Sequence, residues 1–126
     1  MTSLALNNLP VVSNGSIDAY INYVNSLPLL TEKEEFDYAE KWRQQEDVEA
    51  AKHLVLSHLR LVVSISRNYL GYGLPFADII QEGTIGLMKA VKRFDTSHKV
   101  RLVTFAMHWI KAEINEYVFT DELIEK

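Results

Sequence analysis

Cationic and aromatic side chains alternate through residues 89–111, and they are the residues whose chemistry is most distinctive. Asp95 is the only acid in this stretch. Cations can follow the phosphates of a single strand of nucleic acid while rings stack on its bases, so the combination predicts single-strand binding. These cations and rings are Lys89, Lys92, Arg93, Phe94, Lys99, Arg101, Phe105, His108, Trp109 and Lys111.

The same residue types also have simpler interpretations. Phe105, Trp109 and Tyr117 recur at helical spacing, and periodicity alone favours a place in a helical core. Carboxylate pairs such as Asp78 and Glu82 could serve acid–base catalysis, but carboxylates on helix faces are usually solvated. The four histidines fall on separate elements without the paired spacing of a metal site. We therefore expect neither an enzyme nor a bound metal or cofactor.

The residues that precede this stretch predict the helix that must position it. From Asp78 to about Phe94, apolar residues recur every three to four positions, the period of a helix with one buried face. Gly83 and Gly86 lie inside this helix, where each costs about 1 kcal/mol relative to alanine. Their presence predicts a close approach by another backbone. The apolar stripe comprises Ile79, Ile80, Leu87, Met88 and Val91.

Capping signals and apolar periodicity place four more helices. Thr31 followed by Glu34 forms a capping box, and Ser16 and Asp47 are further caps. The glycines of GYGLP end the third helix, which is expected to be the longest, and its proline starts the next helix in or near the first turn. These helices are expected from Ser16 to about Ser26, from Thr31 onward, from Asp47 to about Tyr69, and from the VRLVTF segment to about Val118.

The expected fold is an all-α domain of about five helices. Val100–Phe105 has a strand-like composition, but no second candidate strand could pair with it. In the second helix, Phe36, Ala39 and Trp42 are expected to face inward. The core is expected to include Leu54, Val55, Leu59, Val62, Ile65, Ile80, Leu87, Val91, Phe94 and Ile110.

Composition sets the outer limits. The chain has 126 residues, no cysteine and a net charge of −4. Residues 30–50 hold eight acids and three bases, and residues 113–126 hold five acids and one base, so only the middle is basic. No apolar run approaches the ~20 residues of a membrane span and no signal peptide is evident, which predicts a cytoplasmic protein. The expected divisions are a flexible leader at 1–15, the helical domain at 16–118 and a divergent acidic tail at 119–126.

Three segments resemble a known family. DIIQEGTIGLMKAVKRF and FAMHWIKAEI resemble the bacterial RNA polymerase sigma factors of the primary-factor class, which are promoter-recognition subunits. With SHLRLVVSISRNYLGYGLP added, the chain is most similar to the heat-shock sigma factor. The resemblance covers about Leu27 to Val118. It implies the central promoter-melting domain, regions 1.2 and 2, with a role in transcription initiation and in the heat-shock or stress response.

The resemblance implies two partners, core RNA polymerase and single-stranded promoter DNA. Docking on the clamp coiled coil of the polymerase large subunit is implied for Asp78, Gln81, Glu82, Thr84 and Met88. A pocket for an adenine flipped from the non-template strand of the minus-ten element is implied for Phe105, His108 and Trp109. Contacts to phosphates, or to the upstream edge of the element, are implied for Lys92, Arg93, Lys99, Arg101, Lys111 and Asn115.

Several positions depart from the family pattern. Val100, Arg101 and Leu102 replace an aromatic-lysine-aromatic run, so fewer rings surround the pocket. Thr84 stands where the family usually has asparagine, which predicts weaker docking. After EYV the chain reads FTDELIEK in place of a basic LRNWR-type segment and an upstream-reading helix-turn-helix domain, and the acids should weaken duplex binding. A fragment, a degenerate gene product and a stand-alone domain are all compatible with this. So is a polymerase-binding decoy that never touches DNA.

Overall fold

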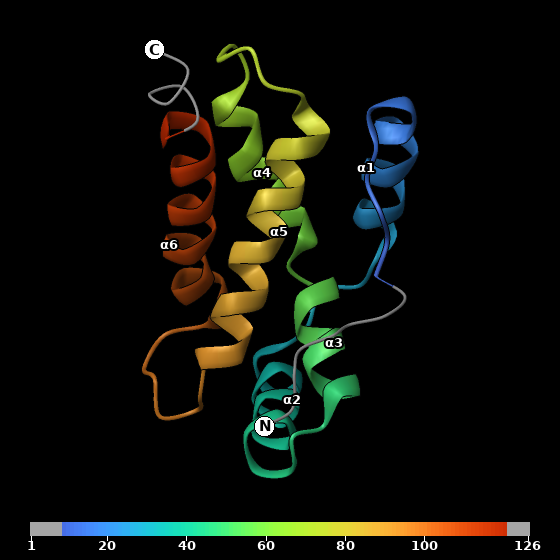
Figure 1. The fold of residues 1–126 in the computed structure, drawn as a ribbon. Coiled ribbons are helices and arrows are strands. Elements are labelled where there is room, and N and C mark those ends of the chain that lie inside the picture. Colours follow the sequence, from blue (N-terminus) through green and yellow to red (C-terminus); the bar gives the residue numbers. More distant parts are fainter. Residues whose placement is uncertain (1–8, 121–126) are drawn as a thin grey trace.

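The longest helix, α5 (Phe76–Arg93), lies at the centre of the molecule beside the antiparallel helix α6 (Leu102–Asn115), as Figure 1 shows. The computed structural model describes residues 9–120, and among these it contains six α-helices and no strand. The predicted all-α fold is therefore confirmed. The other elements are α1 (Ile17–Ser26), α2 (Glu32–Gln45), α3 (Val48–Leu56), α4 (Leu59–Ser66), 3-10 turns at Asn14–Ser16 and Arg67–Tyr69, and a π-helical turn at Glu116–Thr120.

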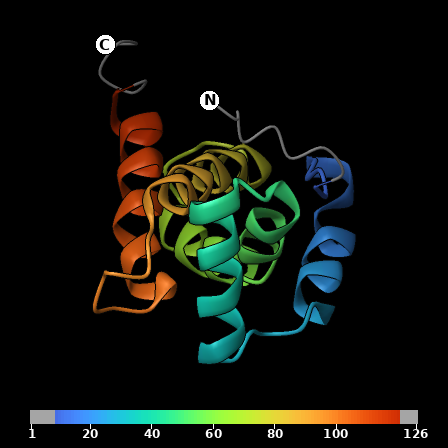
Figure 2. The ribbon, with the colours of Figure 1, turned by 90° about the horizontal axis from the view of Figure 1, so that it is seen from below.

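The remaining helices surround α5. In Figure 2, α6 and α1 lie on opposite sides of it, and α2 and α3 lie toward the viewer. α4 packs along α5, and α2 pairs with α3. All ten residues of the predicted core are buried, which confirms the stripes read from the sequence. No helix of the described residues is long and apolar enough to span a membrane.

Glycine sets the distance between α5 and α6. A Cβ on Gly86 would lie 2.5 Å from the carbonyl oxygen of Trp109 and 2.8 Å from the Cα of Ile110. Gly83 is also buried, and its Cβ would lie 2.9 Å from Val62 Cγ1. The predicted close approach of a backbone is thus confirmed for Gly86, where the backbone is that of α6 in the same chain. Gly83 instead faces side chains of α4 and α6, so neither glycine faces an external partner.

The helix expected from Asp47 to Tyr69 is in fact two helices, and this prediction was wrong. α3 ends at Leu56 and α4 begins at Leu59. The Leu54 carbonyl accepts a hydrogen bond from the Ser57 hydroxyl at 3.1 Å and from His58 Nδ1 at 2.8 Å. The backbone N–H of His58 binds the Val55 carbonyl instead. In a continuous helix the backbone N–H of His58 would bond to the Leu54 carbonyl. Here side-chain donors occupy that carbonyl, because Ser and other short polar side chains can compete with the helical backbone.

The face of α2 that packs against the core differs in part from the predicted face. The capping box of Thr31 and Glu34 is present, and Ala39 and Trp42 are buried as expected. Phe36, however, is 51% exposed, and Glu35 is buried in its place. Glu35, Ala39 and Trp42 follow each other at spacings of four and three, so they share one helical face and Phe36 lies beside it.

The expected division into leader, helical domain and tail stays a prediction. At the N-terminal end of the described residues, Val12 is buried while Ser13 and Asn14 are exposed, and the Asn14 side chain accepts a hydrogen bond from the backbone N–H of Ala77 at 3.3 Å. Ser16 occupies the N-cap of α1 but makes no capping hydrogen bond, because its hydroxyl pairs with that of Ser13. Near the C-terminal end of the described residues, Phe119 packs against Tyr72. Residues 1–8 and 121–126 lie outside the described residues.

Candidate nucleic-acid interface

Four rings follow one another across the C-terminal end of α5 and the start of α6. Phe94 stacks on His98 with ring centroids 5.5 Å apart, and His98 lies 4.7 Å from Phe105. Phe105 in turn lies 6.3 Å from Trp109. Phe105 and Trp109 are only partly buried, so ring surface is left for an external base. The structure therefore brings together two of the three predicted pocket residues.

Trp109 is held on one side by a cation. The Arg93 guanidinium lies over its ring, 4.8 Å from the centroid, which is a cation–π distance. A shallow hollow of about 270 Å³ is lined by His108, Trp109 and Ala112. The third predicted pocket residue, His108, is exposed and lines this hollow beside Trp109, outside the ring cluster itself. A ring with a fixed orientation and an open neighbour is suited to stacking on an unpaired base.

Sequence reasoning missed His98 as a member of the ring cluster. The Asp95 carboxylate accepts hydrogen bonds from the backbone N–H and the hydroxyl of Ser97, and these bonds are the main reason why the pKa of Asp95 is lowered. This turn places His98 against Phe105. The DTSH sequence is a recognisable Asx-turn signal, and it could have indicated a defined loop at this point.

Arg101 is already engaged within the protein. Its Nε and Nη2 donate to Glu35 Oε1 at 3.2 Å and 3.1 Å, and these bonds raise the pKa of Arg101. Glu35 Oε2 also accepts from the backbone N–H of Leu102 at 2.9 Å. The predicted phosphate contact by Arg101 would therefore have to compete with a buried carboxylate.

The other predicted nucleic-acid residues differ in their exposure and in their contacts within the protein. Lys99 and Lys111 are exposed, whereas Lys92 is partly buried. Asn115 accepts a hydrogen bond from the Tyr69 hydroxyl at 2.7 Å, which fixes the direction of its amide. Lys89 forms an ion pair with Glu113 across α5 and α6.

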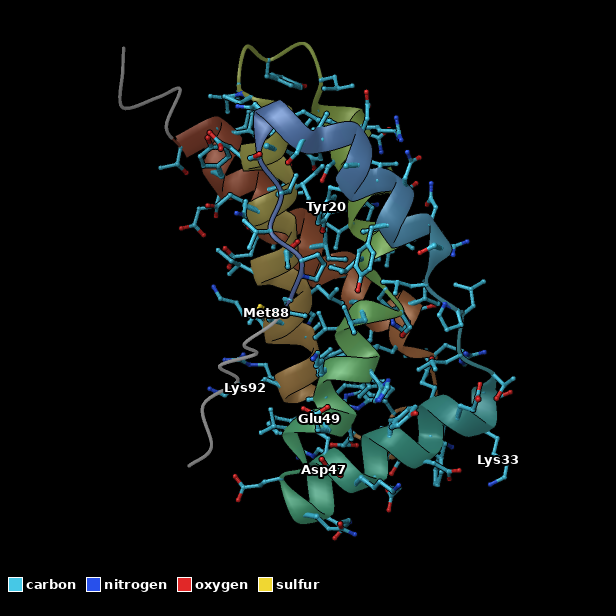
Figure 3. All side chains as sticks on the ribbon, turned by 90° about the vertical axis from the view of Figure 1, so that its right-hand side faces the viewer. Tyr20, Lys33, Asp47, Glu49, Met88 and Lys92 are labelled. Atoms are coloured by element: carbon cyan, nitrogen blue, oxygen red, sulfur yellow. The ribbon has the colours of Figure 1, made fainter. Side chains whose placement is uncertain are left out.

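The predicted polymerase-docking residues lie on α5, but they do not form one uniform face. Asp78 and Gln81 are exposed, and Glu82 and Met88 are partly buried. Figure 3 shows Met88 and Lys92 along one edge of the helix. Thr84 is turned toward α1, because its side chain bonds to the Ile80 carbonyl and to Tyr20.

Ile85 was missed by sequence reasoning, although it is 41% exposed on this surface. It lies four residues after Gln81 and three before Met88, so the three side chains share one side of the helix. Applying the helical spacing of three to four residues from Gln81 would have identified Ile85.

A second hollow, of about 390 Å³, lies between the α1–α2 connection, α4 and the start of α6. Its walls include Leu29, Leu61 and Val103, and Glu35 and His58 also line it. This hollow could not be predicted from the sequence, because its lining comes from separate segments of the chain. No cluster of residues suited to a metal ion occurs among residues 9–120.

Comparison with known proteins assigns the family. Residues 54–121 match the family model described as sigma-70 region 2, which is more than half of the chain. The chain belongs to the sigma-70 region 2 family. It is 45% identical over 116 residues to RNA polymerase sigma factor RpoH of Caulobacter vibrioides (strain NA1000 / CB15N), an alignment that covers 91% of this chain and 39% of the relative. This family member therefore spans about two fifths of that relative. The predicted resemblance to sigma factors, with closeness to the heat-shock factor, is supported by this match. Membership of the primary-factor class stays a prediction.

Proposed function

We propose that the chain is a sigma-factor domain that docks on core RNA polymerase through α5 and binds the non-template strand of the minus-ten promoter element through the rings of α6. The proposal includes a cytoplasmic location, no catalytic activity, and docking on the clamp coiled coil of the polymerase large subunit. The observation that carries it is the ring cluster from Phe94 to Trp109, with Arg93 over Trp109. It is supported by the family membership and by the similarity to a relative named as an RNA polymerase sigma factor.

In this proposal the rings and the cations have separate tasks. Phe105 and Trp109 offer stacking surface to a flipped base, which offsets a few kcal/mol of lost stacking in the duplex. Lys99 and Lys111 are exposed and can follow phosphates. Because the net charge is −4, binding of the strand should require polymerase to hold it in place.

The second candidate is a polymerase-binding decoy that does not read DNA. One observation favours it: two of the cations near the rings, Lys89 and Arg101, are paired with Glu113 and Glu35. Fewer free cations mean fewer counterions released on binding and a weaker grip on DNA.

Replacing Trp109 with alanine distinguishes the two candidates. In a complex with core polymerase, Trp109→Ala should weaken binding of the non-template strand about tenfold, because stacking is worth about 1–3 kcal/mol per base. Fluorescence anisotropy with a labelled strand and a scrambled strand measures this. Tyr23→Ala is the matched control, since Tyr23 is an exposed ring on α1, across the molecule from α6 (Figure 1). Equal binding of both strands by the parent, unchanged by Trp109→Ala, would favour the decoy.

A further inference from the structure

Glu35 is a buried acid whose carboxylate accepts hydrogen bonds from the start of the helix that carries the rings. It is 4% exposed, although it belongs to the acidic first turn of α2. Its two carboxylate oxygens bind the Arg101 guanidinium and the Leu102 backbone N–H. A buried carboxylate costs free energy unless it is paired and hydrogen-bonded, and here both conditions are met.

The bond to Leu102 replaces a cap that α6 does not supply itself. Arg101 stands at the N-cap position of α6, and its side chain makes no capping hydrogen bond. The first turn of a helix leaves backbone N–H groups without helical partners, and negative charge is favoured there. Glu35 provides both the acceptor and the charge from a different helix.

Other residues of α2 hold the rest of the loop that joins α5 to α6. The Thr96 hydroxyl donates to Glu40, and Arg43 lies 3.8 Å from Asp95. Trp42 Nε1 donates to the Val91 carbonyl at 3.1 Å, at the end of α5. Residues of α2 thus fix the end of α5, the loop and the start of α6, which are the three segments that carry the ring cluster.

We infer that Glu35 is a positioning residue for strand binding: it sets where α6 begins and so holds Phe105 against Phe94 and His98, and Trp109 beside Phe105 and Arg93. Phe105 lies one helical turn after Arg101, and its backbone N–H bonds to the Arg101 carbonyl at 3.2 Å. A shift at Arg101 therefore moves the first ring of α6 directly. This inference rests on the proposed function, because it concerns the same strand-binding site.

Because Glu35 is charged, Glu35→Gln can either strengthen or weaken DNA binding, and the direction of the change tests the inference. Glu35→Gln removes a negative charge beside the strand-binding surface and weakens the hold on Arg101. If only electrostatics mattered, DNA should bind more tightly. If Glu35 positions α6, the strand should bind more weakly.

The experiment measures anisotropy of a labelled non-template strand with the polymerase complex, at several salt concentrations. Glu35→Gln should bind the strand about fivefold more weakly, which corresponds to about 1 kcal/mol, the typical net contribution of one hydrogen bond. Core polymerase should be captured as by the parent, because α5 keeps its outer face. Asp37→Asn is the matched control: Asp37 is exposed, lies on the same helix and pairs with Lys33 of that helix, so the same charge change should leave binding unaltered.

Arg101→Ala is a second, independent test of the role of Glu35. Because Arg101 is engaged with Glu35, its loss should weaken strand binding without changing the salt dependence. A flatter salt dependence would make Arg101 a phosphate contact and overturn the inference, and so would equal or tighter binding by Glu35→Gln. If circular dichroism shows that Glu35→Gln is unfolded, Arg101→Ala decides alone. Trp109→Ala distinguishes failure of the proposed function from failure of the role of Glu35. If Trp109→Ala does not weaken strand binding, the proposed function fails. If Trp109→Ala weakens strand binding and Glu35→Gln does not, only the role of Glu35 is refuted.

Discussion

His58 is a buried histidine whose surroundings favour its uncharged form. Burial is the largest cause and lowers the pKa of His58, while the hydrogen bond to the Leu54 carbonyl and the charge of Glu35 oppose this in part. Arg101 adds a smaller lowering. Below the ordinary pKa of about 6.5 the unfolded chain binds a proton at this residue that the folded chain does not. The free energy of unfolding should therefore be fully maintained above about pH 6.5 and decrease as the pH falls from there toward the folded pKa.

Urea denaturation at a series of pH values from about 7.5 to about 5.5 tests this expectation. His58→Asn keeps a side-chain N–H for the Leu54 carbonyl but does not titrate, so its stability should fall less over the same range. The exposed histidines His53, His98 and His108 are common to both proteins and cancel in the comparison. Equal pH dependence of parent and variant would show that His58 keeps its ordinary pKa in the folded state.

At the scale of elements, the close contact between α5 and α6 depends on the absence of a side chain at Gly86. Gly86→Ala should lower the free energy of unfolding by about 1–3 kcal/mol, the usual cost of overpacking, even though alanine is the better helix former. The added Cβ would meet backbone atoms of Trp109 and Ile110, which cannot rotate away. Gly83→Ala should cost less, because its nearest neighbour is the Val62 side chain.

Chemical denaturation of three alanine variants provides the measurement. Gly15→Ala is the control, since no atom lies within 4 Å of the position that its Cβ would take. The expected order of destabilisation is Gly86, then Gly83, then Gly15. A Gly86→Ala variant as stable as the parent would mean that α6 can move away from α5 without loss.

The elements that the sequence predicted well are those whose signals are local. The capping box at Thr31, the glycine stop before α5 and the buried stripes all depend on residues within a few positions of one another. The break between α3 and α4 is also local but was missed, because the sequence does not indicate that the side chains of Ser57 and His58 bond to the Leu54 carbonyl. An apolar stripe that continues across a break looks like one long helix.

The candidate site was predictable in its residue types but not in its pairings. The family resemblance indicated Phe105, His108 and Trp109, and periodicity alone would have assigned the rings to the core. The engagement of Arg101 was beyond reach, because its partner Glu35 lies 66 positions away in the sequence. Asn115 and Tyr69 are 46 positions apart, and the same limit applies to them.

At the scale of the whole molecule, α5 links the two proposed interfaces. Its exposed residues Asp78, Gln81 and Ile85 belong to the docking surface, and its last residues, Arg93 and the adjoining Phe94, belong to the ring cluster. A single helix of 18 residues therefore carries both. Because a continuous helix is stiff, docking at one part of α5 fixes the direction in which the rings are presented.

The last prediction concerns this docking surface. Ile85 is the large apolar side chain at its centre, between Gln81 and Met88, and an exposed isoleucine among polar neighbours is suited to burial against a partner helix. Ile85→Gln should weaken capture of core polymerase about tenfold or more, since burying such a side chain is worth about 1.5–3 kcal/mol. Gln81→Ala combined with Glu82→Ala should also weaken capture, by removing polar contacts at the edge of the surface.

Pull-down of purified core polymerase measures this, and circular dichroism checks that helicity is unchanged. Tyr23→Gln is the matched control, because it makes a similar apolar-to-polar change at an exposed position of α1. Loss of capture by Ile85→Gln together with normal capture by Tyr23→Gln places the partner on α5, whereas normal capture by both the Ile85 variant and the double alanine variant would place it elsewhere. Since the rings lie on a different side of α5, an Ile85→Gln protein that is forced onto polymerase at high concentration should still bind the non-template strand in a manner that depends on Trp109.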